Sequence, residues 1–196
     1  MILEGLLTTT AADSSVHVAP MGPIVDESLQ TFTLRPFQTS TSYQNLKRTG
    51  VGVFHVTDDV EMLARAAVGR LRPVPSTKRC HSVNGFVLSD ACRWFALKVE
   101  ELDDAQERTT IVCRAIGQGE LRPFFGLNRA KHAVVEASIL ATRLHLLAHD
   151  EIARQFVALR PLVDKTGGAA ELRAFAFLEE YVRNAGVPLP TTGGAA

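Results

Sequence analysis

The sequence predicts an α+β protein that is mainly β: a small antiparallel barrel with Greek-key character, followed by a C-terminal helical appendage. Over the first two thirds of the chain, short β-prone runs alternate with turn residues, and only short helical runs interrupt them. From Asn128 onward, apolar residues recur every three or four positions, which is the period of helices. We therefore expect a barrel domain at 1–126, a helical subdomain at 127–187 and a disordered tail at 188–196.

The strands are predicted from β-prone runs that end at turn-forming residues. The second run begins with clear alternation and is then broken by Pro20, Gly22 and Pro23. Because these breakers cannot lie inside a regular central strand, they predict a bulged or irregular edge with free backbone groups. The predicted strands are 2–10, 16–25, 30–36, 51–57, 84–101 and 108–118, with a basic loop at 70–82 and an acidic turn at 100–107.

Helices are predicted where a capping residue precedes an apolar stripe and a glycine or proline follows it. Short helices are expected at 41–49, where Thr41 caps and Gln44 completes a capping box, and from Asp58 or Asp59 to about Val68. Longer ones are expected from Asn128 to about 148, from Asp150 to the residue before Pro161, and from Ala170 to Ala185.

The composition is that of an ordinary soluble globular protein, with 46% hydrophobic and 21% charged residues. Basic and acidic residues balance at 21 each, so no net field draws the chain toward nucleic acid or an anionic membrane. No apolar run approaches the roughly 20 residues that a membrane span requires. We therefore expect neither nucleic acid nor a membrane among its partners.

The cysteines, three in number and widely spaced, form no C-x-x-C motif. This pattern favours free thiols in a reducing compartment over a disulfide scaffold. The first residues lack a basic segment and carry Glu4 within an apolar run, unlike a signal peptide. We expect a cytoplasmic protein.

The most informative segment is residues 34–46, where Arg35 ends a strand and four hydroxyl residues precede a short helix. A helix start offers unpaired N–H groups and a partial positive charge, and Arg35, Thr39, Ser40 and Thr41 add donors there. This combination suits a phosphate. The alternative is that Thr41 only caps the helix.

Four other patterns carry weaker alternatives. His145 and His149, four apart on the expected long helix, suit zinc but lack a third ligand. His55 near Asp58 and Asp59 suits acid–base chemistry or a hydrogen-bonded strand histidine. The motif Leu-Arg-Pro-Phe occurs at 34–37 and again at 121–124, and both copies could supply cationic groups to one anionic ligand. The densest cationic run suits a polyanion or a solvated loop; it contains Arg65, Arg70, Arg72, Lys78, Arg79 and His81.

An ordered set of motifs resembles domain-of-unknown-function family 447, flavoproteins of the split-barrel FMN-binding group, over roughly residues 1–186. The motifs are Glu-Gly-Leu-Leu-Thr-Thr from Glu4, Val-Ala-Pro-Met-Gly-Pro from Val18, Leu-Arg-Pro-Phe-x-x-Ser-x-x-Tyr-x-Asn-Leu from Leu34, Val-Phe-His-Val-Thr-Asp-Asp from Val53 and Asn-Arg-Ala-Lys-His-Ala-Val-Val-Glu-Ala from Asn128.

This resemblance implies an antiparallel split barrel that forms a homodimer with FMN in a cleft between the subunits. It places the FMN phosphate at Arg35, Thr39, Ser40 and Thr41. It also implies that the flavin ring lies beside the second strand, at Ala19, Pro20, Met21 and Gly22, with Asn128 and Arg129 as further contacts.

The resemblance favours an FMN-dependent oxidoreductase or flavin reductase that acts on a small molecule with a nicotinamide donor. It also hints at pterin-linked one-carbon metabolism. Two alternatives stay open, namely a flavin carrier without turnover and a split-barrel scaffold without cofactor. No catalytic residue is identified, and no metal is expected.

Overall fold

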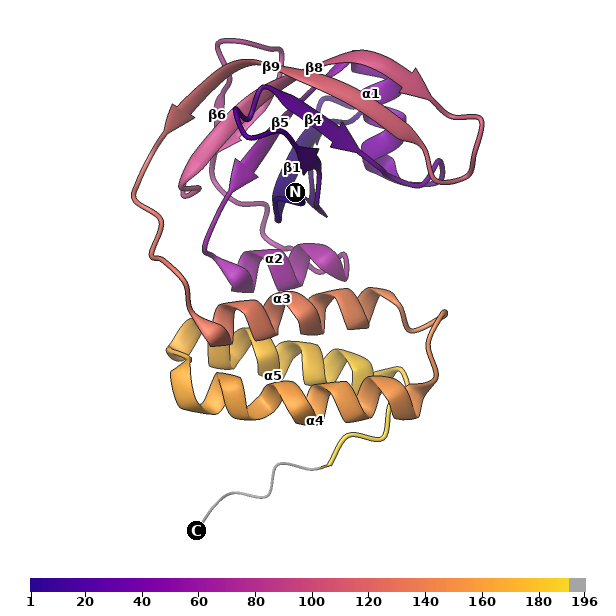
Figure 1. Ribbon diagram of the computed structural model, residues 1–196, viewed down its shortest axis with the longest axis vertical. Coiled ribbons are helices and arrows are strands. Elements are labelled where there is room, and N and C mark those ends of the chain that lie inside the picture. The colour runs from indigo at the N-terminus through magenta and orange to yellow at the C-terminus, as the bar shows by residue number, and fades with distance from the viewer. Residues whose placement is uncertain (191–196) are drawn as a thin grey trace. The chain divides into compact units, whose positions relative to one another are not determined.

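The computed structural model describes residues 1–190, and its central feature is a curled antiparallel sheet of seven strands (Figure 1). Residues 191–196 of the predicted tail lie outside the described part of the chain. The strand order is β2-β1-β5-β8-β9-β4-β3. The strands are β1 Gly5–Thr10, β2 Val16–Met21, β3 Ile24–Val25, β4 Thr31–Leu34, β5 Val51–Val56, β8 Arg93–Asp103 and β9 Thr110–Glu120.

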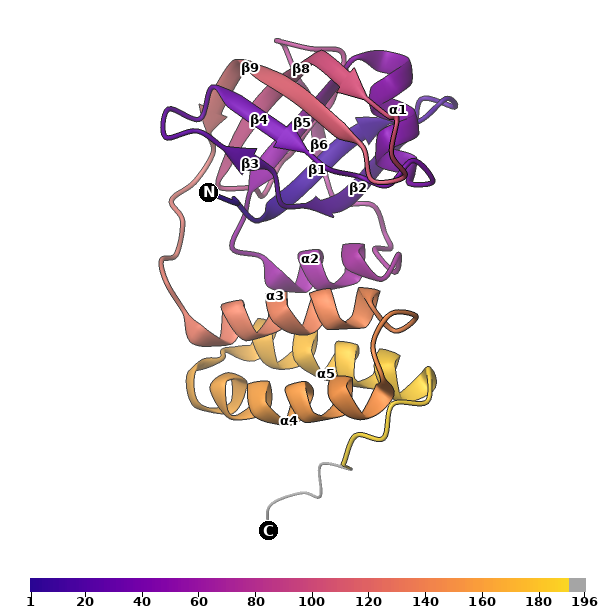
Figure 2. The same ribbon diagram turned by 45° about the vertical axis from the view of Figure 1, so that its right-hand side comes forward.

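The sheet curls around a core of aromatic and branched side chains. Phe32 of β4 lies 5.6 Å from Phe54 and 5.2 Å from Phe95, measured between ring centroids, and all three rings are fully buried. Two register shifts in the β8–β9 pairing bend this long hairpin, as β-bulges do. An isolated bridge between Ile2 and Ile24 joins the chain start to β3, so the two ends of the sheet approach each other (Figure 2). The predicted α+β class, with an antiparallel curled sheet and C-terminal helices, is confirmed.

Strand β2 lies at an edge of the sheet, as the prolines predict, but it is regular. Its register with β1 runs without a shift from Val16 to Met21, and Pro20 lies opposite Leu6. A proline is tolerated here because the other side of an edge strand has no neighbour that needs its N–H. The expected bulge is therefore replaced by a turn at Gly22 and Pro23, which leads directly into β3.

The basic loop contains a short hairpin that the sequence analysis missed. Strand β6, Thr77–Arg79, pairs with β7, Phe86–Leu88, in a separate two-stranded sheet. The predicted strand at 84–101 is thus two strands, β7 and β8, separated by a turn. The charged side chains of β6 hid its β character, because they are exposed and do not alternate with apolar ones.

The helices are α1 Thr41–Thr49, α2 Val60–Ala67, α3 Arg129–Thr142, α4 His149–Thr166 and α5 Ala169–Asn184. The chain divides into two compact units, one of residues 1–58 and 72–125, the other of residues 59–71 and the chain from Gly126 onward. The segment 59–71, which contains α2, thus leaves the barrel to join the C-terminal helices.

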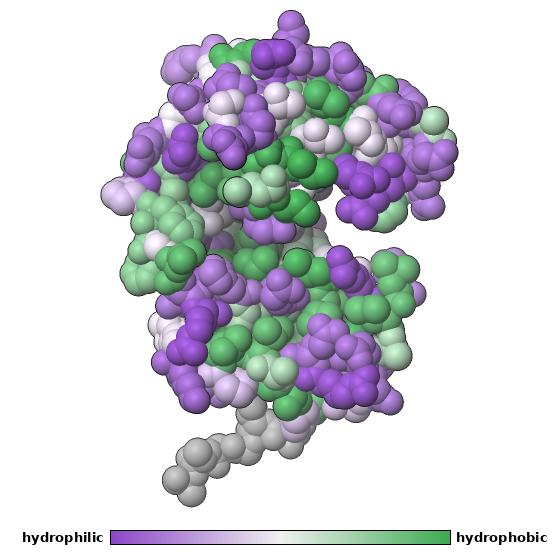
Figure 3. Space-filling model, viewed as in Figure 1, coloured by the Kyte–Doolittle hydropathy of each residue, from purple (hydrophilic) through white to green (hydrophobic). Residues whose placement is uncertain are grey.

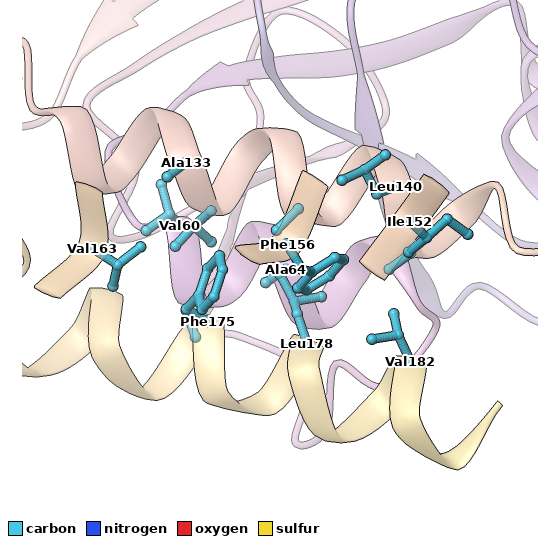
Figure 4. Packing of buried hydrophobic residues seen from close by; sticks show 14 of the residues in the cluster. Val60, Ala64, Ala133, Leu140, Ile152, Phe156, Val163, Phe175, Leu178 and Val182 are labelled. Atoms are coloured by element: carbon cyan, nitrogen blue, oxygen red, sulfur yellow. The ribbon is translucent and has the colours of Figure 1, made fainter. Parts of the chain in front are cut away.

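The helical unit has its own core. Val60 and Ala64 of α2 point among the side chains of the other three helices (Figure 4). Phe156 of α4 and Phe175 of α5 are buried there with ring centroids 5.6 Å apart. Because α2 supplies part of this core, the helical unit depends on a segment that interrupts the barrel in the sequence.

Two helix boundaries differ from prediction. Helix α3 ends at Thr142 rather than near 148, and α4 continues through Pro161 to Thr166. His145 therefore lies in the turn after α3, while His149 opens α4 and contacts the carbonyl of Gly186 at 3.3 Å through Nδ1. The shared helix face expected for a histidine pair does not exist. Among the described residues, no cluster of three metal-ligating side chains forms.

His55 is a structural histidine inside the barrel. Its Nε2 accepts a hydrogen bond from the Leu88 amide at 3.0 Å, so Nδ1 carries the proton and donates to the Leu6 carbonyl at 3.2 Å. Asp58 instead accepts from Arg122 and from the Phe125 amide. Burial lowers the pKa of His55 to about 4. The strand-histidine interpretation holds, and the ring ties β5 to β1 and β7.

We predict that acid destabilises the protein partly through His55. Its pKa is lower in the folded state than in the unfolded chain, so the unfolded state binds more protons below about pH 6.5. The free energy of unfolding should fall by roughly 3 kcal/mol between pH 7 and pH 4 from this residue alone. Urea titrations at several pH values measure the change.

The control is His55→Gln, whose side-chain carbonyl can replace the acceptor at Nε2 but cannot titrate. Burial also lowers the pKa of His17, so the test is the difference between the pH profiles of the two proteins. Parallel profiles for wild type and variant would show that His55 is not the source.

Candidate functional site

The start of α1 is built by Ser40 rather than by Thr41. The Ser40 backbone is extended, with φ −76° and ψ 143°, and its hydroxyl accepts from the Tyr43 amide at 3.2 Å. The predicted Thr41 cap and its capping box are therefore wrong, because Gln44 donates to the Gln38 carbonyl instead. Either hydroxyl could cap, and the backbone turn before the helix decides which one does.

This start retains hydrogen-bond donors. Within the described chain, the amides of Thr41 and Ser42 have no hydrogen-bond partner, as expected for the first residues of a helix. Ser40 uses its hydroxyl as an acceptor, so the hydroxyl hydrogen stays free to donate. Thr39 and Thr41 are exposed beside it. The hydroxyls and amides thus gather at the positive end of the helix dipole.

Arg35 follows β4 directly and lies five residues before this helix cap. It is exposed, and its guanidinium has no partner among the described residues, so it is available to a ligand. Its backbone carbonyl accepts from Nε of Arg108 at 3.4 Å. The backbones of Phe37 and Arg108 also form an isolated antiparallel β-bridge, which joins the segment after β4 to the segment before β9. A second cation, which the sequence analysis missed, therefore lies next to the first.

The turn between β8 and β9 holds α1 in place (Figures 1 and 2). Asp104 accepts from the Tyr43 hydroxyl at 2.6 Å and from Lys47 Nζ at 2.7 Å. These bonds raise the pKa of Lys47 and lower that of Asp104, with the Lys47–Asp104 hydrogen bond as the largest cause in both cases. Gln38 adds a bond from Nε2 to the Asp104 carbonyl at 2.6 Å. Helix α1 and the segment before it, at Gln38, are thus both hydrogen-bonded to the same turn.

A cavity of about 340 Å³ opens beside Arg35. Its lining combines two arginines, two carboxylates, an amide, a hydroxyl and an aromatic ring, and it includes none of Thr39, Ser40 and Thr41. The lining residues are Arg35, Phe37, Asp103, Gln106, Glu107, Arg108 and Thr110. Arg35 therefore faces a depression whose lining does not include the start of α1.

The remaining predicted site residues lie elsewhere. Ala19, Pro20 and Met21 are half-buried in the edge strand β2, and Gly22 follows in the turn to β3. A Cβ atom on Gly22 would lie 3.0 Å from a methyl group of Ile2, so a larger residue would crowd that turn. These residues belong to the same unit as Arg35.

Asn128 and Arg129 belong to the helical unit. Asn128 caps α3 as predicted, with Oδ1 accepting from the Lys131 amide at 3.1 Å. Its Nδ2 donates to the Thr166 carbonyl at 3.0 Å, so its side chain also ties α3 to the end of α4. Arg129 is exposed.

The second Leu-Arg-Pro-Phe segment does not offer a free cation. Both terminal nitrogens of Arg122 donate to the Asp58 carboxylate, and its Nε donates to the Asp90 carbonyl at 2.9 Å. The Asp58 side chain is 9% exposed and that of Arg122 is 38% exposed, so this ion pair is partly buried. The two copies of the motif therefore differ, since Arg35 has a free guanidinium within the described residues and that of Arg122 is held in an ion pair.

The sequence analysis missed Asp104, Gln106 and Arg108 because they lie in a turn that reads as acidic and solvated. The only available signal was the length of the β8–β9 hairpin, which must place its turn beside some neighbouring element.

None of the described helices is long and apolar enough to cross a membrane.

The fold is shared with solved flavin-related structures. An FMN-bound protein of Methanosarcina mazei is 21% identical, with a TM-score of 0.79 over 92% of this chain and 94% of that one. A 2-nitrobenzoate 2-nitroreductase of Pseudomonas fluorescens is 11% identical (TM-score 0.51, 60% of this chain and 64% of that one). The flavin reductase of styrene monooxygenase from Pseudomonas putida S12 is 15% identical (TM-score 0.50, 61% and 79%).

None of the curated proteins matches the chain. Two family profiles do, however, and together they span most of its length. The profile described as protein of unknown function (DUF447) N-terminal domain matches residues 3–122, and the one described as protein of unknown function (DUF447) matches residues 128–180. The chain therefore belongs to the DUF447 family, as its ordered motifs predict.

Proposed function

We propose that this protein binds FMN in its barrel unit, with the FMN phosphate at the start of α1. The observation that carries the proposal is the set of free donors at that start, namely the amides of Thr41 and Ser42 and the Ser40 hydroxyl. The exposed Arg35 guanidinium, five residues before the cap in the sequence, is proposed to join them. Helix starts bind phosphates through their free amides and partial positive charge, and guanidinium groups bind them through charge-assisted hydrogen bonds. The likeness to an FMN-bound protein over nearly the whole chain supports it.

In this proposal Thr39 and Thr41 add hydroxyl donors to the phosphate, and the flavin ring lies along β2. An edge strand has one row of backbone N–H and C=O groups without a neighbouring strand, and the ring edge requires such partners. Ala19, Pro20, Met21 and Gly22 supply that edge. Asn128 and Arg129 are proposed as further contacts, of which Arg129 has the more available side chain.

The proposed activity is that of an FMN-dependent oxidoreductase or flavin reductase acting on a small molecule. Bound FMN would supply the redox chemistry, with a nicotinamide dinucleotide as the hydride donor, and the residues at the start of α1 and along β2 would hold it. The protein then needs only to position the ring and its substrates. A flavin carrier without turnover is the second candidate. Among the residues proposed to hold FMN at the start of α1 and along β2, none is identified as a catalytic acid or base.

The first prediction concerns the chromophore. The freshly purified protein should show flavin absorbance bands, and denaturation should release FMN. Anaerobic addition of NADH or NADPH should bleach the bands, and a specific acceptor should restore them. The proposal is contradicted if the protein is purified colourless and retains no FMN after incubation with FMN and removal of the unbound cofactor. FMN that binds but is never reduced favours the carrier.

The second prediction concerns the phosphate. Arg35→Ala with Ser40→Ala should weaken FMN binding at least roughly tenfold, since two charge-assisted contacts are lost. Riboflavin, which lacks the phosphate, should bind both proteins equally. Fluorescence titration of the apoprotein measures both affinities, and an unchanged FMN affinity would refute the assigned phosphate site.

Loss of the Ser40 cap alone costs about 1 kcal/mol of stability, so two controls separate folding from binding. The pair Asp59→Ala with Lys98→Ala removes another helix cap and another exposed cation, and should leave FMN affinity unchanged. Ser40→Asp keeps a good cap but sets a carboxylate against the phosphate. It should retain the melting temperature and lose FMN binding.

The third prediction concerns assembly. We propose a homodimer, because the barrel unit exposes large hydrophobic side chains that a single copy does not cover (Figure 3). They include Ile24, Ile116, Phe124 and Phe125, which are 44–73% exposed. Light scattering at micromolar concentration should give twice the chain mass of 21.3 kDa. A monomer would contradict a cofactor cleft shared between subunits.

A further inference from the structure

The cavity beside Arg35 has a lining that a phosphate alone does not explain. Two cations, Arg35 and Arg108, are matched by the carboxylates of Asp103 and Glu107, so the lining is electrically balanced. Its volume of about 340 Å³ lies at the lower end of the range for small-molecule sites. A balanced, partly aromatic lining suits a ligand that carries an anion together with a base and hydroxyl groups.

We propose that this cavity binds an adenosine 5′-phosphate group. Two molecules carry such a group, FAD in place of FMN and the reduced nicotinamide dinucleotide that serves as donor. The inference rests on the proposed function through Arg35, which lines the cavity and is also the proposed phosphate ligand at the start of α1. In FAD the two phosphates are adjacent, so the adenylate phosphate would lie next to the phosphate proposed at the start of α1. In the nicotinamide dinucleotide both phosphates belong to the donor itself.

The phosphate end of the cavity is formed by Arg35 and Arg108. The backbone bridge between Phe37 and Arg108 sets the spacing of the segments that carry them, and the Arg108 Nε bond to the Arg35 carbonyl fixes one guanidinium. The terminal nitrogens of Arg108 and the whole Arg35 guanidinium have no partner among the described residues. Two planar guanidinium groups at one cavity can each bind phosphate oxygens in bidentate fashion.

We assign the base to Phe37 and Gln106, which also line the cavity. The Phe37 side chain is 48% exposed, and the Arg108 guanidinium carbon lies 5.8 Å from its ring centroid. A purine can stack on such a ring, as bases do on aromatic side chains in single-stranded nucleic-acid sites. The amide of Gln106 is free among the described residues, and a glutamine amide pairs with N6 and N7 of adenine.

The carboxylates of Asp103 and Glu107 are proposed to accept hydrogen bonds from the ribose hydroxyl groups. Asp103 accepts from the Ala105 amide at 3.0 Å through Oδ1, which leaves Oδ2 for a ligand. The Glu107 side chain is exposed and lines the cavity. Carboxylate oxygens accept hydrogen bonds from hydroxyl groups, whereas they repel a bare anion. Inorganic phosphate should therefore bind much more weakly than AMP.

The experiment uses AMP as the probe on the FMN-loaded protein, followed by calorimetry or by quenching of flavin fluorescence. Wild type should bind AMP, and Arg108→Ala and Phe37→Ala should each weaken AMP binding at least tenfold while FMN affinity changes less than about twofold. The matched control is Arg114→Ala, which removes an exposed arginine of β9 outside the cavity. Its AMP affinity should equal that of wild type.

Two arms separate the sources of the adenylate. The apoprotein is titrated with FAD and FMN, and the FMN-loaded protein is reduced with NADH under single-turnover conditions. If FAD is the source, Arg108→Ala lowers FAD affinity tenfold and leaves the NADH concentration dependence unchanged. If the donor is the source, the NADH concentration for half-maximal reduction rises tenfold and FAD affinity stays constant.

The inference is overturned if FMN binds normally but AMP does not bind, or if Arg108→Ala and Phe37→Ala bind AMP as wild type does. It is also overturned if Arg108→Ala loses FMN affinity as strongly as AMP affinity, because the cavity would then be part of the FMN site. If FMN itself fails to bind, the proposed function falls first, so the two failures are distinguishable.

Discussion

The geometry of the candidate site depends on the attachment of α1 to the turn between β8 and β9. A nine-residue helix has little stability of its own, so tertiary contacts must fix its position. Asp104 supplies the main contact by accepting from both Tyr43 and Lys47, one turn apart on the same helix face. Gln38 binds the same turn from the segment before the helix. The free amides at the start of α1 are therefore held at a defined place on the barrel.

The same hairpin connects the two proposed binding regions. Its turn fixes α1, and Arg108 and Thr110, at the start of the returning strand, line the cavity. The register shifts between β8 and β9 bend this long hairpin, and its turn supplies Asp103, Gln106 and Glu107 to the cavity that Arg35 lines. A change in the hairpin would thus alter both regions together, although the sequence separates 34–41 from 103–110 by more than 60 residues.

The sequence predicted the elements that are governed by local chemistry. Gly50 ends α1 in the left-handed conformation with φ +68°, and Asp59 caps α2 by accepting from the Met62 amide. Predictions from periodicity were weaker. Leu144 and Leu147 continue the apolar spacing of α3, yet they pack on the helical core from the turn beyond it. Their spacing reflects burial against the core and not helical structure. No neighbouring residue in the sequence distinguishes a buried turn from a continued helix here.

The candidate site was predictable only where its residues are contiguous. The segment from Arg35 to Thr41 was found because a cation and hydroxyls precede a helix within seven positions. Arg108 could not be found, because its role depends on a single backbone bridge to Phe37 that no pattern encodes. The assignment of α2 to the helical unit is similar, since its apolar stripe fits either core.

Ser40 shows why a cap and a ligand site need not be alternatives. A hydroxyl has two acceptor lone pairs and one hydrogen, and the cap uses one lone pair. The hydrogen remains to donate to an anion at the same helix end, so one side chain can stabilise α1 and bind a phosphate at once. A carboxylate cap would satisfy the helix equally well but would repel the ligand. At this position, aspartate would only cap the helix, whereas serine can cap the helix and also donate a hydrogen bond to a phosphate.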